Sequence, residues 1–85
     1  MKITILYFAS LREALGVERE AVDLPSEVKT ATDLRNWLRG RGEPWASQLA
    51  EGRAVRVAVA RQMAAPHASL MDGAEVAFFP PVTGG

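Results

Sequence analysis

The chain has 85 residues, and its ten basic and ten acidic side chains cancel to a formal net charge of zero. This length supports one hydrophobic core, and the neutral balance without a Lys/Arg run argues against nucleic acid or an anionic membrane as a partner. The sequence has no cysteine and one histidine, which excludes disulfides, thiolate nucleophiles, iron–sulfur clusters and a zinc site with the usual ligand count.

The sequence contains no targeting, membrane-spanning or nucleotide-binding motif. The apolar start is interrupted by Arg12 and Glu13, and no apolar run approaches the length that spans a membrane. The glycine-rich loops that cradle nucleotide phosphates are also missing. We therefore expect a cytoplasmic protein, and any ATP chemistry must belong to a partner.

Residues 2–8 (KITILYF) are predicted to form the first strand. They are β-branched and aromatic, and they are apolar on both alternating faces, as in a central strand that is covered on each side. A short helix over residues 11–15 is predicted next. Ser10 and Glu13 have the spacing of a capping box, and Gly16 suits the position that follows a helix.

An exposed strand over residues 17–24 and then the main helix are predicted to follow. The strand is assigned from a weaker and more polar pattern than that of the first strand. The helix can be capped by Thr30 or Thr32, and it should run to Arg39 and stop at Gly40. Its apolar stripe, which we interpret as core, comprises Leu34, Trp37 and Leu38.

The second half of the chain is predicted to add a short helix and further strands. Pro44 suits a first helical position and is followed by Trp45, which we also interpret as core. Alternating valines predict a strand over residues 55–59, and residues 62–64 can return as its short partner. A last strand over residues 75–79 (EVAFF) follows an Asp-Gly turn.

These elements predict an α+β domain over residues 1–79. The strands cluster at both ends of this segment, which is typical of a mixed sheet of about five strands packed on one main helix plus short helices. The first and last strands are the most apolar on both faces. We therefore expect them to be adjacent and parallel at the centre of the sheet.

Residues 80–85 (PPVTGG) form a predicted extended tail. Pro80 and Pro81 fix φ and supply no amide donor, so the chain must leave the sheet there. Gly84 and Gly85 carry no Cβ, so this end suits delivery of a carboxylate into a narrow channel of another protein. The alternative is a frayed end in which the glycines have no role.

Two segments resemble a known family. The segment LYFASLREALG, near the start, is similar to the first strand and helix of the molybdopterin synthase small subunit family. The segment EVAFFPPVTGG, residues 75–85, is similar to the C-terminal signature of the same family. This family is ubiquitin-like, so the resemblance implies a β-grasp fold. The chain departs from the family pattern at Ala74, where an acid is common, and at Ala60-Arg61, where an asparagine-containing hairpin is common. These departures concern local turn geometry.

The resemblance implies a sulfur carrier whose working group is the carboxyl terminus of Gly85. A ubiquitin-activating-type adenylyltransferase would adenylate this carboxylate with ATP, and a sulfur donor such as a cysteine desulfurase would convert it to a thiocarboxylate. The tail would then enter the large subunit of molybdopterin synthase and donate sulfur to cyclic pyranopterin monophosphate, which forms the molybdopterin dithiolene. Gly84 would give access, and this chain itself would bind no cofactor.

An apolar patch beside the tail is predicted to dock this partner. Alternation along the first and last strands assigns Phe8 and Phe79 to the face opposite the core, and Met63 is a candidate to join them. The alternative is that a loop simply covers these side chains. The predicted partner-binding part of the tail comprises Pro80, Pro81, Val82 and Thr83.

Other functions are compatible with the same ending. A Gly-Gly end would also serve a carrier for thiamine synthesis or for tRNA thiolation, although FFPPVTGG favours molybdopterin. It would equally serve a protein modifier that is conjugated to lysines through Gly85, as ubiquitin is. A plain binding domain with an incidental tail would tolerate the loss of Gly84 and Gly85.

Overall fold

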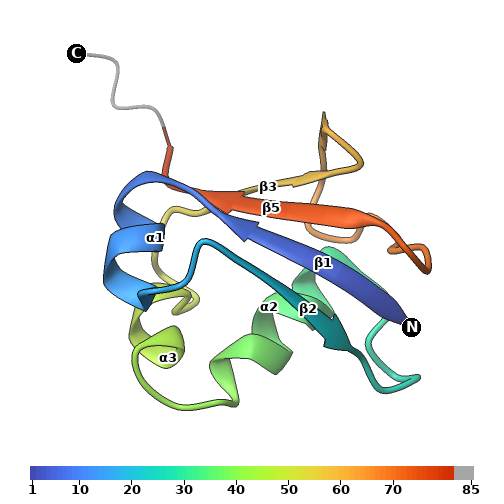
Figure 1. Cartoon of the computed structure of the whole chain (residues 1–85), viewed down its shortest axis with the longest axis horizontal. Helices are drawn as coiled ribbons and strands as arrows, with labels where there is room; N and C mark the ends of the chain where they lie inside the picture. The colour runs from blue at the N-terminus through green and yellow to red at the C-terminus, as the bar shows by residue number, and fades with distance from the viewer. Residues whose placement is uncertain (82–85) are drawn as a thin grey trace.

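A mixed sheet of five strands in the order β2-β1-β5-β3-β4 forms one layer of the molecule, and the helices cover one of its faces (Figure 1). The computed structural model describes residues 1–81. No helix within this range is long and apolar enough to cross a membrane. The elements follow the chain as β1 (Lys2–Tyr7), α1 (Ala9–Leu15), β2 (Arg19–Asp23), α2 (Ala31–Arg39), α3 (Trp45–Gln48), β3 (Arg56–Val59), β4 (Gln62–Met63) and β5 (Glu75–Phe79).

The first and last strands lie side by side inside the sheet. β1 and β5 are parallel neighbours, and their register runs from the pair Thr4–Glu75 to the pair Tyr7–Phe78. β2 is antiparallel to β1 on its outer side, and β3 is antiparallel to β5 on the other side. The predicted α+β architecture is confirmed, with the first and last strands adjacent, parallel and interior as in a β-grasp fold.

The core fills the space between the sheet and the helices. Because side chains along a strand alternate between faces, every second residue of β1 and β5 points toward the helices and is almost fully buried. Leu34 and Leu38 of α2 lie one helical turn apart and are both 0% exposed, so α2 packs its apolar stripe on the sheet. The strand residues of this core are Ile3, Ile5, Tyr7, Val76 and Phe78.

The main helix, α2, is capped by Thr30. Its hydroxyl accepts a hydrogen bond of 3.1 Å from the N–H of Asp33, and the Asp33 carboxylate accepts one of 3.1 Å from the N–H of Thr30. The N–H of Lys29 also donates to this carboxylate, and these donors lower the pKa of Asp33. Thr32, the other predicted cap, instead donates to the carbonyl of Pro66 at 2.8 Å.

The first helix, α1, begins earlier than predicted. The capping box predicted from Ser10 is wrong, because the helix starts at Ala9 and its N-cap is Phe8, with no side-chain cap. The N–H of Phe8 still donates to the carbonyl of Phe78 in β5 at 3.1 Å, so the helix starts directly from the end of the sheet. Gly16 has a left-handed φ of 72° and ends the helix as predicted.

The hairpin between β3 and β4 turns through two left-handed residues. Ala60 and Arg61 have φ values of 51° and 66°, which is the geometry that asparagine and glycine favour in a two-residue hairpin. Alanine and arginine adopt it at some cost in strain. β4 ends at Met63, one residue earlier than predicted, because the chain turns toward α2 after Ala64.

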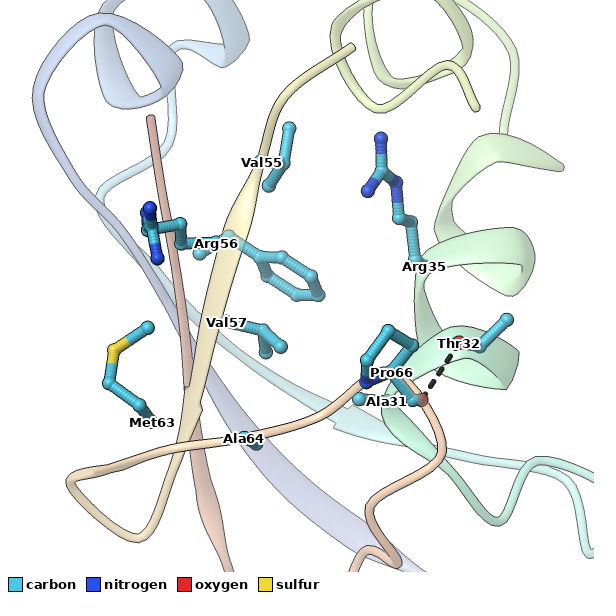
Figure 2. A pocket seen from close by; sticks show the side chains of 10 residues that line it. Ala31, Thr32, Arg35, Val55, Arg56, Val57, Met63, Ala64 and Pro66 are labelled. Carbon is cyan, nitrogen blue, oxygen red and sulfur yellow. Dashed lines mark hydrogen bonds between the residues drawn. The ribbon is translucent and has the colours of Figure 1, made fainter. Parts of the chain in front are cut away.

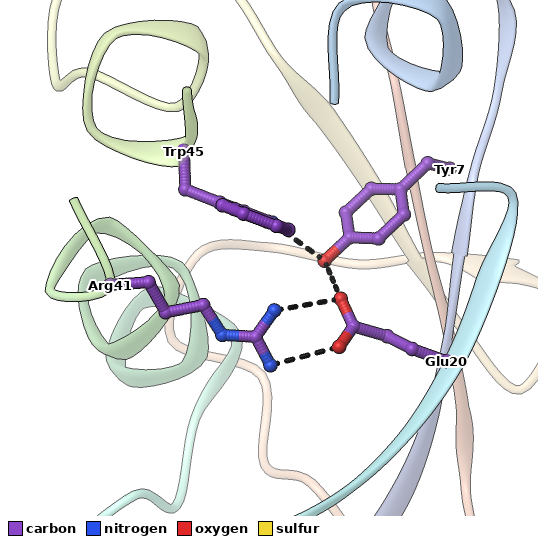
Figure 3. Close-up of polar contacts among 4 residues, drawn as sticks. All are labelled: Tyr7, Glu20, Arg41 and Trp45. Atoms are coloured by element: carbon purple, nitrogen blue, oxygen red, sulfur yellow. Dashed lines mark hydrogen bonds and ion pairs between the residues drawn. The ribbon is translucent and has the colours of Figure 1, made fainter. Parts of the chain in front are cut away.

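A cluster of four side chains ties the helices to the edge of the sheet (Figure 3). The hydroxyl of Tyr7 donates to Glu20 Oε2 at 2.8 Å and accepts from Trp45 Nε1 at 3.2 Å. Arg41 donates two hydrogen bonds of 2.9 Å to the two carboxylate oxygens of Glu20. Burial raises the pKa of the Tyr7 hydroxyl above its usual range, so it remains protonated and donates to Glu20.

The same cluster explains the positions of the two tryptophans. The guanidinium of Arg41 lies over the ring of Trp45 at 4.9 Å and over the ring of Trp37 at 5.2 Å, within the range of a cation–π interaction. Both rings pack against the core but remain partly exposed. The tryptophans therefore cover the core and hold Arg41, and the prediction that they are core residues is correct only in part.

We expect Tyr7→Phe to lower the free energy of unfolding by about 1–2 kcal/mol, because the indole N–H of Trp45 loses its acceptor while the ring packing is kept. Urea unfolding of Tyr7→Phe, Trp45→Phe and the double variant measures the coupling between the two side chains. A coupling energy near zero would show that the hydrogen bond between them contributes nothing to stability.

Candidate functional site

β5 brings the end of the described chain to the middle of the sheet. Its last residue is Phe79, and the half-buried Pro80 and Pro81 follow. Because proline has no N–H, these residues cannot donate to a continued ladder with β1 or β3. The other residues predicted to act lie outside the described range, and they are Val82, Thr83, Gly84 and the reactive Gly85.

The face of the sheet opposite the helices carries a row of apolar side chains. Leu6 of β1 pairs with Ala77 of β5, and Ala77 pairs with Ala58 of β3. Ala58 in turn pairs with Met63 of β4. These residues alternate along their strands with core residues, so they point away from the helices. The row therefore crosses the sheet from β1 to β4.

Two phenylalanines extend this row toward the end of β5. Phe8 has an extended backbone with φ −121° and ψ 155°, so it continues the alternation of β1. Since Tyr7 pairs with Phe78, Phe8 comes next to Phe79 one residue further along. Phe8 and Met63 are 45% and 59% exposed, so no described loop covers them, whereas Phe79 is half-buried.

The structure thus joins the three predicted docking residues through residues that the sequence analysis missed. Strand alternation alone places Leu6 on the same face as Phe8, and Ala77 on the same face as Phe79. The register between the strands is needed to show that the first pair lies beside the second. We call the whole set the open-face patch, and it comprises Leu6, Phe8, Ala58, Met63, Ala77 and Phe79.

Arginines border the open-face patch on two sides. Arg19 pairs with Leu6 at the β2 edge, and Arg56 pairs with Phe79 on the β3 side. Neither forms an ion pair with a carboxylate of residues 1–81. An apolar centre with unpaired positive charge at its border suits a protein surface that has carboxylates around an apolar contact.

The open face has the chemistry of a docking surface. In residues 1–81, the titratable groups with a clear pKa shift are Tyr7, Asp33 and Arg35, and all three lie on the helix side of the sheet. None of the six residues of the open-face patch is a nucleophile or a general base. The patch itself therefore supplies an apolar contact surface and no catalytic side chain.

Comparison with known proteins agrees with these features. The model of the ThiS family matches residues 5–85. The molybdopterin synthase sulfur carrier subunit of Haemophilus influenzae is 37% identical over 83 residues, which cover 98% of this chain and 99% of that protein.

Solved structures share the fold. Small archaeal modifier protein 1 from Haloferax volcanii superposes with a TM-score of 0.76 and 26% identity, covering 95% of this chain and 98% of that one. A chain in the protein–protein complex of subunits 1 and 2 of molybdopterin-converting factor from Helicobacter pylori has a TM-score of 0.66 with 19% identity over 100% of both chains, which shows the fold alone. This chain belongs to the ThiS family, and over almost its whole length it is similar to a molybdopterin synthase sulfur carrier subunit.

Proposed function

We propose that this chain is the sulfur carrier subunit of a molybdopterin synthase and that the carboxyl terminus of Gly85 carries the sulfur. The observation that carries the proposal is the Gly84-Gly85 ending, directly after Pro80-Pro81-Val82-Thr83, in a chain of the ThiS family. The interior strand β5 leads directly into Pro80-Pro81 and then to Gly84-Gly85. The near full-length similarity to a sulfur carrier subunit supports the same role.

The chemistry requires activation of a main-chain carboxylate. A carboxylate is a poor electrophile, because its negative charge repels nucleophiles and oxide is a poor leaving group. An adenylyltransferase partner would couple it to AMP from ATP with release of pyrophosphate. The persulfide of a donor such as a cysteine desulfurase would then displace AMP to give an acyl disulfide, and a second thiol would reduce its S–S bond, which leaves a thiocarboxylate on Gly85 and a disulfide on the donor. A chain without cysteine suits this route, because its own side chains offer no competing thiol.

The open-face patch and the tail would together engage the large subunit. A chain with the same fold from Helicobacter pylori is found in a complex of subunits 1 and 2 of molybdopterin-converting factor. In our proposal the patch binds the partner beside the end of β5, and Val82 to Gly85 enter its active site. Sulfur then passes to cyclic pyranopterin monophosphate, and two such transfers build the dithiolene. We expect this ATP-dependent activation and the transfer that follows to take place in the cytoplasm.

A second candidate function is conjugation to other proteins through Gly85. It is favoured by the structural similarity to a protein named small archaeal modifier protein 1. The two functions differ in their products. A modifier would give higher-mass adducts that depend on Gly85 in lysates, whereas a carrier would give a protein about 16 Da heavier, because sulfur replaces one terminal oxygen. Intact mass of the protein purified from its own source therefore tests the proposal directly.

We expect Phe79→Arg to weaken binding to the large subunit by about tenfold or more while thermal stability changes little. The substitution forces a charge into an apolar contact, but Phe79 lies on the open face and not in the core. Titration calorimetry and thermal unfolding measure the two effects. Phe78→Ala is the matched control, because Phe78 is 1% exposed and its loss should mainly reduce stability. An equal loss of both properties in Phe79→Arg would mean that Phe79 acts as core.

The length of the tail should decide sulfur transfer. Deleting Gly85, or adding one residue after it, displaces the reacting atom by about 3.3 Å, whereas reaction requires an approach within roughly 3 to 3.5 Å. We therefore expect loss of transfer with nearly unchanged stability and docking. Gly84→Ala should give an intermediate rate, because it adds a methyl group and removes glycine-only backbone angles.

The assay is conversion of cyclic pyranopterin monophosphate by the reconstituted complex. The tail variants are supplied as chemically prepared thiocarboxylates, so that failure of activation does not imitate failure of transfer. Near wild-type turnover by the longer or shorter thiocarboxylate would rule out an inserted tail as the mechanism.

A further inference from the structure

A pocket of about 220 Å³ lies between β3 and α2, on the helix side of the sheet (Figure 2). Val55 and Val57 point toward it from the β3 segment, and Arg35 faces them from α2. Arg56 and Met63 border the pocket, but their side chains point to the opposite side of the strand. The remaining residues around it are Ala31, Thr32, Ala64, Pro66 and Phe78, so its walls are mostly apolar.

The edge of β3 beside this pocket has unpaired backbone groups. The N–H of Ala60 donates to the carbonyl of Glu75 in β5, so the backbone groups of Ala60 point toward β5. Because these groups alternate in direction along an antiparallel strand, the N–H and C=O of Val55 and Val57 point away from β5. The C=O of Val57 accepts from the N–H of Ala64 at 3.0 Å, after which the chain leaves toward α2. Within residues 1–81, the N–H of Val57 and both backbone groups of Val55 have no hydrogen-bond partner.

Arg35 adds an unpaired positive charge at the Val55 end of the pocket. Its Nε and Nη2 groups donate hydrogen bonds of 2.6 to 2.8 Å to the carbonyls of Leu49, Ala50 and Arg53. Its Nη1 group makes no hydrogen bond to residues 1–81, and no carboxylate in that range forms an ion pair with it. Burial and then the charge of Arg39 lower the pKa of Arg35, and Glu51 opposes this only in part.

We propose that this edge of β3 and the pocket beside it bind an extended acidic segment of a partner protein by strand addition. One residue of the segment pairs with the N–H and C=O of Val55, which supplies main-chain hydrogen bonds. Its side chain points to the helix side, as Val55 does, and its carboxylate accepts from Nη1 of Arg35. The paired segment is short, because Ala64 already occupies the position opposite Val57.

The unpaired charge of Arg35 and the free backbone groups of β3 together favour an extended acidic segment at this site. A free strand edge selects extended polypeptide, because only a backbone matches its alternating donors and acceptors. A half-buried guanidinium without a counter-ion selects an acidic side chain over a neutral or basic one. The site lies on the helix side of the sheet and the open-face patch on the other, so the proposal does not depend on sulfur transfer.

The test is amide and Nε chemical-shift mapping on the ¹⁵N-labelled full chain. The probe is an acetylated and amidated hexapeptide of alternating valine and glutamate. We expect saturable shifts at the amides of Val55 and Val57 and at Nε of Arg35. Arg35→Met should weaken binding about tenfold, whereas Arg39→Met, which removes the same charge from the same helix outside the pocket, should leave it unchanged.

Two altered peptides test the proposal without changing the protein. A hexapeptide of alternating valine and lysine lacks the carboxylates, and a glutamate peptide that is N-methylated at every second residue cannot pair with a strand edge. Neither should bind. The proposal is overturned if the lysine or N-methylated peptide binds as well as the parent peptide, if equal weakening follows from both arginine variants, or if no saturable shift appears at millimolar peptide.

Other occupants of the pocket give distinct results with no peptide present. Shifts at Val55 and Val57 that grow with protein concentration would assign the site to a second copy of the chain. Shifts at the same amides on removal of residues 82–85 would assign it to the end of the chain itself. Either result replaces the partner segment and overturns the proposal.

Discussion

The parallel pairing of β1 with β5 is the constraint on which the rest of the structure depends. Parallel neighbours cannot be joined by a tight hairpin, so the intervening chain must cross over, and its helices all lie on one face of the sheet. The opposite face is therefore left open. The same pairing sets Phe8 beside Phe79 and makes the chain leave the sheet from an interior strand, so that the apolar patch and the start of the tail are neighbours.

The two sides of the sheet have different kinds of residues for a physical reason. Charged and polar groups that are tied to the core, such as the cluster of Tyr7, Glu20, Arg41 and Trp45, need partners with fixed geometry, and within residues 1–81 the helix side supplies them. The open-face patch has small and apolar side chains that need no polar partner among residues 1–81, and Arg19 and Arg56 lie at its border. A carrier whose reactive group is a main-chain carboxylate requires no catalytic side chain there, which agrees with the composition of this face.

The sequence predicts the secondary structure and the core because these follow from local periodicity. The alternation of β1 and the Gly16 stop of α1 are visible without a structure, and Thr30 is one of the two caps that the sequence offers for α2. The predicted cap of α1 is wrong because the N–H of Phe8 donates to Phe78 in β5, 70 positions further along the chain, and the helix starts directly after Phe8. The open-face patch was only partly predicted, since the link through Leu6, Ala77 and Ala58 depends on register between strands and not on any one strand.

The strand β3 belongs to both candidate binding surfaces. Ala58 points to the open face, where it links Ala77 to Met63, while Val55 and Val57 point to the pocket beside α2. Because side chains alternate with a period of two, a shift of the β3–β5 register by one residue would exchange these sets and place valines on the open face and Arg56 against α2. The pairing of Ala58 with Ala77 therefore keeps the apolar patch, with arginines at its border, on the open face. It also keeps Val55 and Val57 on the helix side, where they face Arg35.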